Sequence, residues 1–459
     1  MAREVTADAD LRFEGFASYP NSATFEPSSF LEYASNVRIM DGVISPRKGS
    51  KLAFVAGQGA DYAVASHGKT GDHIKIFGSN QEYLIDDNAS QVIPQIQGFP
   101  RVRGQGYTQS ICAESTDLDY VAGGNITERL VTAKDDQLRF TAYNGVKPVP
   151  MDTISLVQGT YDRIQALSTS HNMVLAFGKR SIYMVKAGAG YLASQKKQDA
   201  LHQVQKISSS DGATGPDAVA SSGGITVFFD ANRRPGIKVL AGDKFSEGAE
   251  PMSSVIQDIM DQVDPSAYQK VCIVAYAGRF YATLPIIGGK WKVLVVNPQI
   301  KGMFESLDEY PFNPTTLLVA RKADRPRLFA FDSTSGKIFL LEEGEFDSGA
   351  TAFELITSEV RTRNYMFRTM TDKKYDAFFV QMDNADNSSV QIKAITINPD
   401  GEHIMDKFSS AKGNTIRRGL VNKRAMGAKL KIIVTGGSAR ILACGLEAGI
   451  AGKSFFSIY

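Results

Sequence analysis

The feature that most constrains the fold is an apolar strand that runs into a turn of Gly, Asn or Asp and returns as a second strand. The pattern occurs six times, and the six units are His73–Phe77 with Glu82–Ile85, Arg129–Ala133 with Leu138–Tyr143, Met173–Phe177 with Ile182–Val185, Ile225–Phe229 with Ile237–Leu240, Arg279–Leu284 with Trp291–Val296, and Arg327–Phe331 with Lys337–Leu341. Short apolar runs separated by turn residues predict the antiparallel hairpins of an all-β protein.

The spacing of these units indicates a repeat. Successive returning strands are 43 to 57 residues apart, measured between Tyr83, Phe140, Tyr183, Val239, Leu294 and Phe339. Propeller blades repeat every ~40–50 residues with four strands each. We therefore predict a six-bladed β-propeller over residues 56–348. An irregular sandwich or two stacked β-domains is the alternative, because the units share a pattern but little residue identity.

The two ends of the chain differ from the repeat. Residues 349–459 contain longer strands in which apolar and polar residues alternate, such as Val390–Ile397 and Leu430–Val434. Alternation is typical of a half-exposed antiparallel sheet, and it predicts a C-terminal β-sandwich-like module. Residues 1–55 are expected to wrap the propeller and supply a closing strand. Between hairpins, the apolar spacing in Ser253–Val263 predicts a short amphipathic helix.

The composition narrows the classes of function. Hydrophobic residues make up 43% of the 459 residues, which is ample for a buried core. The 51 Lys and Arg against 49 Asp and Glu leave room only for local basic patches, not for a strongly basic nucleic-acid-binding protein. Three widely spaced cysteines predict neither a disulfide framework nor a metal cluster, as expected for a chain in a reducing cytoplasm. No leader and no membrane-spanning run is expected.

Catalytic motifs are not recognised. The five histidines stand near no Gly-x-Ser-x-Gly elbow and in no metal-ligand spacing. Ser209–Thr214 is similar to the Asp-box turn of sialidase-type propellers, but it is incomplete and is interpreted as a turn. The 49 acidic residues neither supply nor exclude the carboxylate pair of a glycosidase. We predict no catalytic residue, no cofactor and no metal.

Basic residues form three local groups that are the candidate partner-facing or DNA-facing positions. They are Arg233 and Arg234 in a propeller turn, Arg361, Arg363 and Arg368, and Arg417, Arg418, Lys423 and Arg424 in the C-terminal module. These residues either form an ordinary solvent-exposed face without a specific function, or they contact phosphate groups or an acidic partner ring.

Short motifs near both ends and in the third unit carry a resemblance to a known family. Residues 36–49 contain an Asn, then Gly42, a strand, and the Arg47-Lys-Gly49 triplet. Together with residues 161–184, 424–434 and 441–447, this segment resembles the tail nozzle, or packaged-DNA stabilization, proteins of short-tailed bacteriophages. In this resemblance Gly42, Arg47 and Gly49 are structural positions.

The resemblance implies a structural virion protein rather than an enzyme. It implies a homo-oligomeric ring, a hexamer, that docks below the head-to-tail adaptor, meets tail fiber or needle proteins, retains packaged DNA and forms the channel for genome ejection. Transient non-specific contact with duplex DNA and a location in the virion tail, after assembly in the host cytoplasm, are also implied. A propeller-type glycan-degrading enzyme and a peptide-binding scaffold propeller are the alternatives; the single tryptophan, Trp291, weakens the scaffold option.

Overall fold

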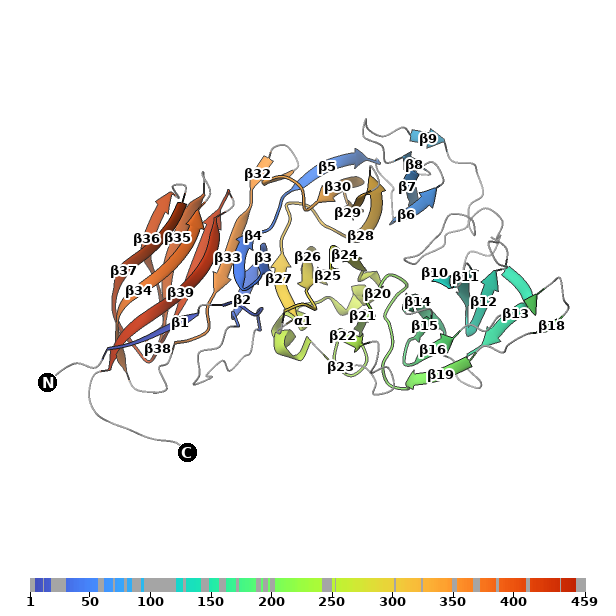
Figure 1. Ribbon diagram of the computed structural model, residues 1–459, viewed down its shortest axis with the longest axis horizontal. Coiled ribbons are helices and arrows are strands. Elements are labelled where there is room, and N and C mark those ends of the chain that lie inside the picture. The colour runs from blue at the N-terminus through green and yellow to red at the C-terminus, as the bar shows by residue number, and fades with distance from the viewer. Residues whose placement is uncertain are drawn as a thin grey trace.

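The computed structural model shows an elongated all-β molecule with a sandwich at one end and small sheets of a propeller over the rest (Figure 1). The structure describes residues 5–10, 12–17, 30–56, 62–68, 71–77, 81–84, 92–94, 121–126, 129–141, 148–156, 162–170, 173–186, 191–192, 197–198, 203–241, 250–251, 253–300, 303–322, 325–348, 353–365, 372–384, 388–409, 413–437 and 439–450.

The propeller consists of antiparallel sheets in which consecutive strands are neighbours. Four of them are β6 (Tyr62–Gly68), β7 (Gly71–Phe77), β8 (Gln81–Leu84) and β9 (Val92–Pro94); β10 (Val121–Ile126), β11 (Arg129–Lys134), β12 (Gln137–Thr141) and β13 (Pro148–Ser155); β14 (Ile164–Ser170), β15 (Met173–Gly178), β16 (Ile182–Lys186) and β19 (Gln203–Ser208); and β20 (Val219–Ser222), β21 (Ile225–Asp230), β22 (Gly236–Ala241) and β23 (Glu250–Pro251). A small hairpin of β17 (Tyr191–Leu192) and β18 (Lys197–Gln198) lies between β16 and β19 in sequence.

Two further sheets complete the described propeller. One contains β24 (Ile273–Tyr276), β25 (Arg279–Ile286), β26 (Lys290–Val296) and β27 (Phe304–Asp308). In the other, β28 (Thr316–Lys322), β29 (Arg325–Asp332) and β30 (Lys337–Leu341) are joined by β5 (Ser50–Val55), β31 (Phe346–Ser348) and β32 (Phe353–Leu355). An N-terminal strand therefore supplies the fourth strand of this sheet.

First strands of successive sheets contact one another, in the order β6, β28, β24, β20, β14 and β10. This arrangement is a β-propeller, and the predicted fold class is confirmed. The count of six blades stays a prediction, because the stretch between β9 and β10 lies outside the described residues.

Each predicted hairpin coincides with the second and third strands of a sheet. β15 and β21 are buried along nearly their whole length, since neighbouring sheets cover both of their faces. Burial on both faces explains why these strands are continuous apolar runs and not alternating ones. Local sequence therefore predicts the middle of each sheet well.

The C-terminal sandwich has two sheets whose inner faces form the main core. One sheet runs β3 (Val37–Met40), β4 (Val43–Pro46), β39 (Arg440–Ile450), β34 (Lys373–Asn384) and β37 (Gly413–Ala425), with β1 (Val5–Asp10) also on β39. The other runs β2 (Tyr33–Ser35), β33 (Thr357–Arg361), β38 (Gly427–Thr435), β35 (Ser389–Ile397) and β36 (Gly401–Ser409). Strict alternation of burial in β35 confirms the predicted half-exposed strands. The N-terminal strands β1 to β4 complete both sheets.

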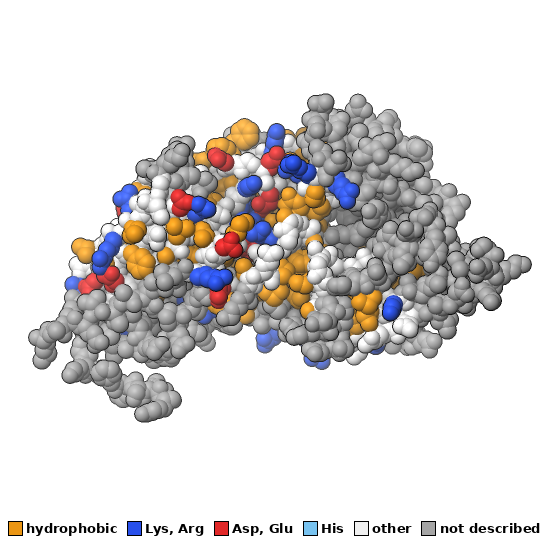
Figure 2. Space-filling model, viewed as in Figure 1, with side chains coloured by type: hydrophobic (Ala, Val, Ile, Leu, Met, Phe, Trp, Pro, Cys, Tyr) orange, Lys and Arg blue, Asp and Glu red, His pale blue; other side chains and the backbone are white. Residues whose placement is uncertain are grey.

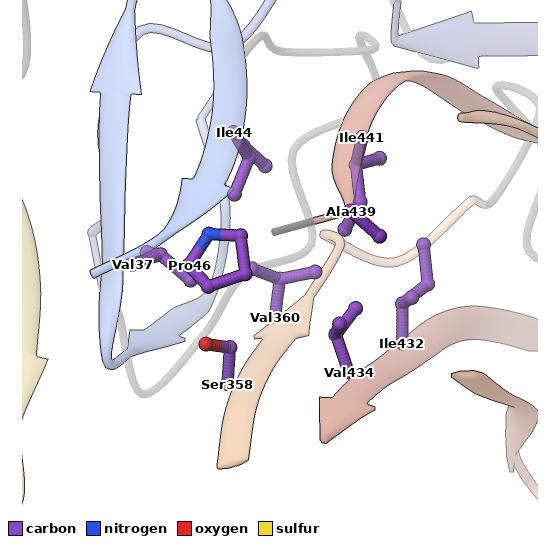
Figure 3. Close-up of a pocket in the computed structure, with 9 residues that line it drawn as sticks. All are labelled: Val37, Ile44, Pro46, Ser358, Val360, Ile432, Val434, Ala439 and Ile441. Carbon is purple, nitrogen blue, oxygen red and sulfur yellow. The ribbon is translucent and has the colours of Figure 1, made fainter. Parts of the chain in front are cut away.

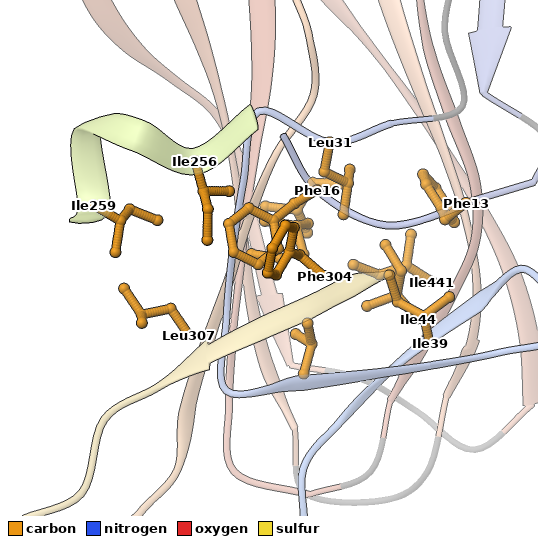
Figure 4. Packing of buried hydrophobic residues seen from close by; sticks show 14 of the residues in the cluster. Phe13, Phe16, Leu31, Ile39, Ile44, Ile256, Ile259, Phe304, Leu307 and Ile441 are labelled. Carbon is orange, nitrogen blue, oxygen red and sulfur yellow. The ribbon is translucent and has the colours of Figure 1, made fainter. Parts of the chain in front are cut away.

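A continuous core joins the sandwich to the propeller (Figure 4). Phe16, from the N-terminal segment, lies against Phe304 of β27, with ring centroids 6.3 Å apart. Its backbone N–H donates to the Phe304 carbonyl at 3.0 Å. Ile256 and Ile259 pack from the opposite side, so the two modules share buried side chains.

The predicted helix over residues 253–263 is only partly present. A 3-10 turn, η3 (Ser253–Ile256), leads into a four-residue helix, α1 (Gln257–Met260). No side chain caps its start at Ile256, which explains why the helix stays short. Most of the apolar residues of this segment are nevertheless buried in the core. A second 3-10 turn, η4 (Pro265–Lys270), follows. Among the described residues, no helix is long and apolar enough to cross a membrane.

Candidate functional site

The three groups of basic residues stand on separate elements. Arg233 and Arg234 are exposed in the turn between β21 and β22, where Arg233 has a positive φ of 59°. Arg361 of β33 is half-buried, bound to Glu359 at 2.6 Å and lying over the Tyr33 ring at 4.9 Å. Arg363 lies over the Phe30 ring, and Arg368 lies outside the described residues. Arg361 and Arg363 are therefore engaged with their own chain.

The last basic group lies along β37, the edge strand of its sheet. Arg418 and Arg424 are exposed, whereas Arg417 and Lys423 are half-buried. Arg418 is paired with Glu447 at 2.6 Å, and Arg417 lies over the Phe408 ring at 4.1 Å. On the face shown in Figure 2, Lys and Arg side chains lie beside Asp and Glu side chains. The predicted partner or DNA role of these residues stays a prediction.

Gly42, Arg47 and Gly49 have structural roles in this chain. Gly42 has a φ of 81° in the turn between β3 and β4. A Cβ on Gly49 would lie 2.0 Å from the Phe346 carbonyl oxygen. The Arg47 side chain is buried and forms a bidentate ion pair with Asp347, with Nη1–Oδ1 at 2.9 Å and Nη2–Oδ2 at 2.5 Å.

A cleft of about 540 Å³ opens on the propeller beside this buried ion pair. It is bounded by the turn between β25 and β26, the segment after β27, the turn between β29 and β30, and the start of β30. We call it the aromatic cleft, and its lining residues are Gly289, Lys290, Trp291, Lys292, Glu309, Tyr310, Pro311, Phe312, Asn313, Asp332, Ser335, Lys337 and Phe339. This volume lies in the range of small-molecule sites.

A stack of rings forms one wall of the aromatic cleft. Phe312 lies parallel to Phe339, with centroids 3.7 Å and planes 5° apart. Tyr310 follows, with its centroid 5.2 Å from that of Phe312. Trp291 lines the same cleft from β26 and is half-buried. Phe312 covers the face of Phe339, which is only 3% exposed, so Tyr310 and Phe312 are the partly exposed rings of this wall.

Residues of the N-terminal segment contact this wall and fix its position. The Arg47 guanidinium lies over the Tyr310 ring, 4.0 Å from its centroid, and donates to the Glu309 carbonyl at 2.8 Å. The Asn36 side-chain oxygen accepts from the Glu309 backbone N–H at 2.8 Å. Burial raises the pKa of Tyr310 well above its usual range, so its hydroxyl stays protonated. The segment at 309–310 is thus anchored on both sides of its backbone.

The two carboxylates of the cleft are already engaged. Glu309 binds Lys292 Nζ at 2.6 Å. Asp332 accepts from the backbone N–H and hydroxyl groups of Thr334 and Ser335, which closes the turn between β29 and β30. Asp332 therefore shapes the turn that precedes Lys337. Among the described residues, no group of three or more His, Cys, Asp or Glu is placed to hold a metal.

The segment similar to an Asp-box is a turn, as predicted. Asp211 accepts from Lys238 Nζ at 2.6 Å and from Ser208 at 2.6 Å. Burial opposes ionisation of Asp211, but these hydrogen bonds outweigh it and lower its pKa. Lys238 also binds Asp230. An internal ion triad therefore links the segment after β19 to β21 and β22.

A second cavity lies between the sheets of the sandwich, but it is only about 10 Å³ (Figure 3). Its lining is almost entirely aliphatic, with Val37, Ile44, Val360 and Ile432 pointing inward. A space of this size holds at most a single water, and an apolar one stays dry. It is a packing gap of the core and not a binding site.

Neither a protein-family model nor a curated protein sequence matches the chain. Among solved structures, it is similar to an exo-beta-1,3-galactanase from Phanerochaete chrysosporium, with 8% identity and a TM-score of 0.30 over 88% of this chain and 100% of that one. A Trypanosoma rangeli sialidase has 7% identity and a TM-score of 0.30, over 86% of this chain and 96% of that one. A family 43 arabinoxylan arabinofuranohydrolase from Bacillus subtilis has 11% identity and a TM-score of 0.23, over 94% of this chain and 98% of that one. At these identities the likeness concerns the fold alone.

These comparisons correct two predictions from the sequence. The resemblance to tail nozzle proteins predicted a structural virion subunit, and the chain was expected not to be an enzyme. The similar structures named above are glycan-degrading enzymes, which match the alternative, so both predictions are wrong as stated. Packing accounts for the motif residues Gly42, Arg47 and Gly49 that carried the resemblance. The predicted ring partners and location stay predictions.

Proposed function

We propose that this protein is a glycan-binding propeller protein and that the aromatic cleft is its saccharide site. The observation that carries the proposal is that Tyr310 and Phe312, with Phe339 stacked behind Phe312, line the same cavity as Trp291. The faces of a sugar ring present C–H bonds, which pack on flat aromatic surfaces. The hydroxyl groups around the ring then need polar partners at the rim.

The rim of the aromatic cleft supplies such partners. Asn313 provides an amide that both donates and accepts hydrogen bonds, and the Ser335 hydroxyl, which donates to Asp332, can still accept one. The lysines of the rim add donors. A peptide ligand would instead gain most from an open strand edge, whereas this cleft is formed largely by turns and the faces of side chains. The mixture of flat apolar wall and polar rim therefore favours a saccharide.

The test uses the single tryptophan of the chain, Trp291, as a built-in reporter. Because it lines the cleft, a bound saccharide should change its fluorescence during titration with oligosaccharides of four to six sugar units. Calorimetry on the Phe312→Ala variant should then show at least about tenfold weaker binding. Phe353→Ala, which removes a 76% exposed ring from β32, is the matched control and should bind like the parent protein.

Two results would overturn the proposal. One is the absence of any saccharide-dependent change in Trp291 fluorescence across neutral and acidic oligosaccharides. The other is equal loss of binding in Phe312→Ala and Phe353→Ala, which would place the saccharide elsewhere. Thermal unfolding of each variant shows that the comparison is between folded proteins.

A further inference from the structure

Three lysines line the aromatic cleft, and their partners differ. Lys292 is paired with Glu309 at 2.6 Å. Lys290 and Lys337 have no carboxylate within ion-pair distance in the part of the chain that the structure describes. Asp332, the other carboxylate of the cleft, has its oxygens engaged by the turn residues Thr334 and Ser335. Asp332 nevertheless keeps its negative charge and stands opposite Lys337 in the β29–β30 register. The three lysines and two carboxylates of the lining therefore leave the cleft with a net charge of +1.

Local geometry fixes where these charges stand relative to the rings. Lys337 precedes Phe339 by two residues in β30, so the two side chains leave the strand on the same face. Lys290 directly precedes Trp291 after a turn in which Gly288 and Gly289 have φ values of 97° and 82°. Only glycine adopts such angles easily, so this turn fixes the start of β26, where Lys290 and Trp291 both line the cleft.

Positive charge beside an apolar wall is a selective feature. A neutral sugar gains nothing from an ammonium group beyond a hydrogen bond, whereas a sugar carboxylate gains a charge-assisted one. The excess of lysines over carboxylates around the cleft favours an anionic ligand over a neutral one. The pairing of Lys292 with Glu309 also limits the excess charge, so that the cleft should not hold every polyanion.

We propose that the aromatic cleft selects acidic saccharides, with Lys290 and Lys337 recognising a carboxylate on a sugar ring that packs on the aromatic wall. This inference rests on the proposed saccharide site and adds the chemical class of its ligand. Lys290 and Lys337 are specificity residues in this assignment, and the rings Trp291 and Phe312 bind the sugar whatever its charge.

The decisive probe is a pair of ligands that differ only in charge. Tetragalacturonate and its fully methyl-esterified form share the same sugar rings, and the ester removes the negative charges. Titration of Trp291 fluorescence in the parent protein should show about tenfold tighter binding of the acid at low salt. Raising NaCl from about 50 to 500 mM should weaken binding of the acid and leave the ester nearly unchanged.

Variants then assign the effect to residues. Lys290→Gln and Lys337→Gln should each weaken binding of the acid by about two- to fivefold, the range of an exposed ion pair. The double variant should bind acid and ester alike. Lys407→Gln, which removes an exposed lysine of β36 in the sandwich, is the matched control and should keep the full preference.

The outcomes separate the two proposals. If both ligands bind with equal affinity, the saccharide site stands and the acidic preference is overturned. If neither ligand changes Trp291 fluorescence while a neutral oligosaccharide does, the acidic preference is overturned. If no neutral or acidic oligosaccharide changes it, the saccharide site itself is overturned. A tetraglutamate peptide that binds as tightly as tetragalacturonate would show recognition of charge alone and would also reject the inference.

Discussion

Arg47 illustrates how a charged residue in a short motif can be entirely structural. Its guanidinium is fully buried, paired bidentately with Asp347 and in contact with the Tyr310 ring. Burial alone would lower its pKa, but Tyr310 and the carboxylate of Asp347 outweigh that effect, so Arg47 stays charged. Ser50 donates to the same carboxylate at 2.9 Å. Such a network is costly to break, because it leaves the opposite charge without a partner.

Replacing Arg47 with Met should lower the free energy of unfolding by about 3–5 kcal/mol, since Asp347 would remain buried without its cation. Urea denaturation followed by circular dichroism measures the change. Arg418→Met removes an arginine whose side chain is 65% exposed and paired with Glu447, and it should cost less than about 1 kcal/mol. Similar losses in the two variants would contradict the role assigned to the buried pair.

Lys373 gives the fold a pH dependence of a definite sign. Its Nζ donates to the Met426 carbonyl at 2.8 Å, and burial lowers its pKa from 10.5 to about 8. Between these pH values the unfolded chain holds the proton that the folded chain has released. Stability therefore rises with pH across this window, by up to about 1.4 kcal/mol per pH unit.

Comparison with Lys373→Met isolates this effect. The variant keeps the aliphatic stem but has no titrating group, so it should be more stable than the parent protein below pH 8. Its advantage should shrink between pH 8 and 10, measured by urea denaturation at one-unit steps. Tyr375, whose pKa burial raises, contributes equally to both proteins. A pH-independent difference would show that burial does not lower the pKa of Lys373 in the folded protein.

The residues that line the aromatic cleft could not be predicted as a site from the sequence. Trp291 was predicted only as the first residue of a returning strand and as the single tryptophan, and Tyr310 and Phe312 belonged to no pattern. The four rings come from β26, the segment after β27 and β30, and only the packing of adjacent sheets brings them together. No local spacing encodes that proximity. The one signal in the sequence was aromatic residues placed directly beside turns, as at Gly289–Trp291.

At the scale of elements, the hairpins were predictable and the partners of distant strands were not. The six predicted hairpins are formed by residues that are neighbours in sequence, so turn residues and apolar runs suffice to identify them. β5 joins β30, and β1 joins β39, over hundreds of residues. β36 and β37 were not identified, because exposed charged and apolar residues mix along both edge strands.

Gly49 tests how closely one of these long-range contacts is fitted. A Cβ at this position would lie 2.0 Å from the Phe346 carbonyl oxygen, which is backbone and cannot move aside cheaply. Gly49→Ala should therefore destabilise the protein by at least about 2 kcal/mol in urea denaturation. Gly223→Ala is the matched control: it has a positive φ of 58° but open space around its Cβ, and should cost about 1 kcal/mol. Equal losses of stability in the two variants would show that the cost at Gly49 does not come from the contact with the Phe346 carbonyl.

At the scale of the molecule, the N-terminal segment couples the propeller to the sandwich. β3 belongs to the sandwich, yet its backbone N–H groups at Val37 and Ile39 donate to Ser306 and Glu305 of β27, at 3.1 and 2.5 Å. Arg38, between them, binds Asp308 of β27 and Glu342, which follows β30. β2, β3 and β4 lie between the two modules in Figure 1.

This coupling predicts cooperative unfolding. In calorimetry the parent protein should unfold in one transition, because the shared core and the Arg38 ion pairs make each module depend on the other. Arg38→Met leaves Asp308 and Glu342 without their shared cation at the place where the modules meet, so it should split the transition into two, with the first lowered by several degrees. Arg418→Met, far along β37, should keep a single transition. Two separate transitions in the parent protein would mean that the N-terminal segment contacts both modules without coupling their stability.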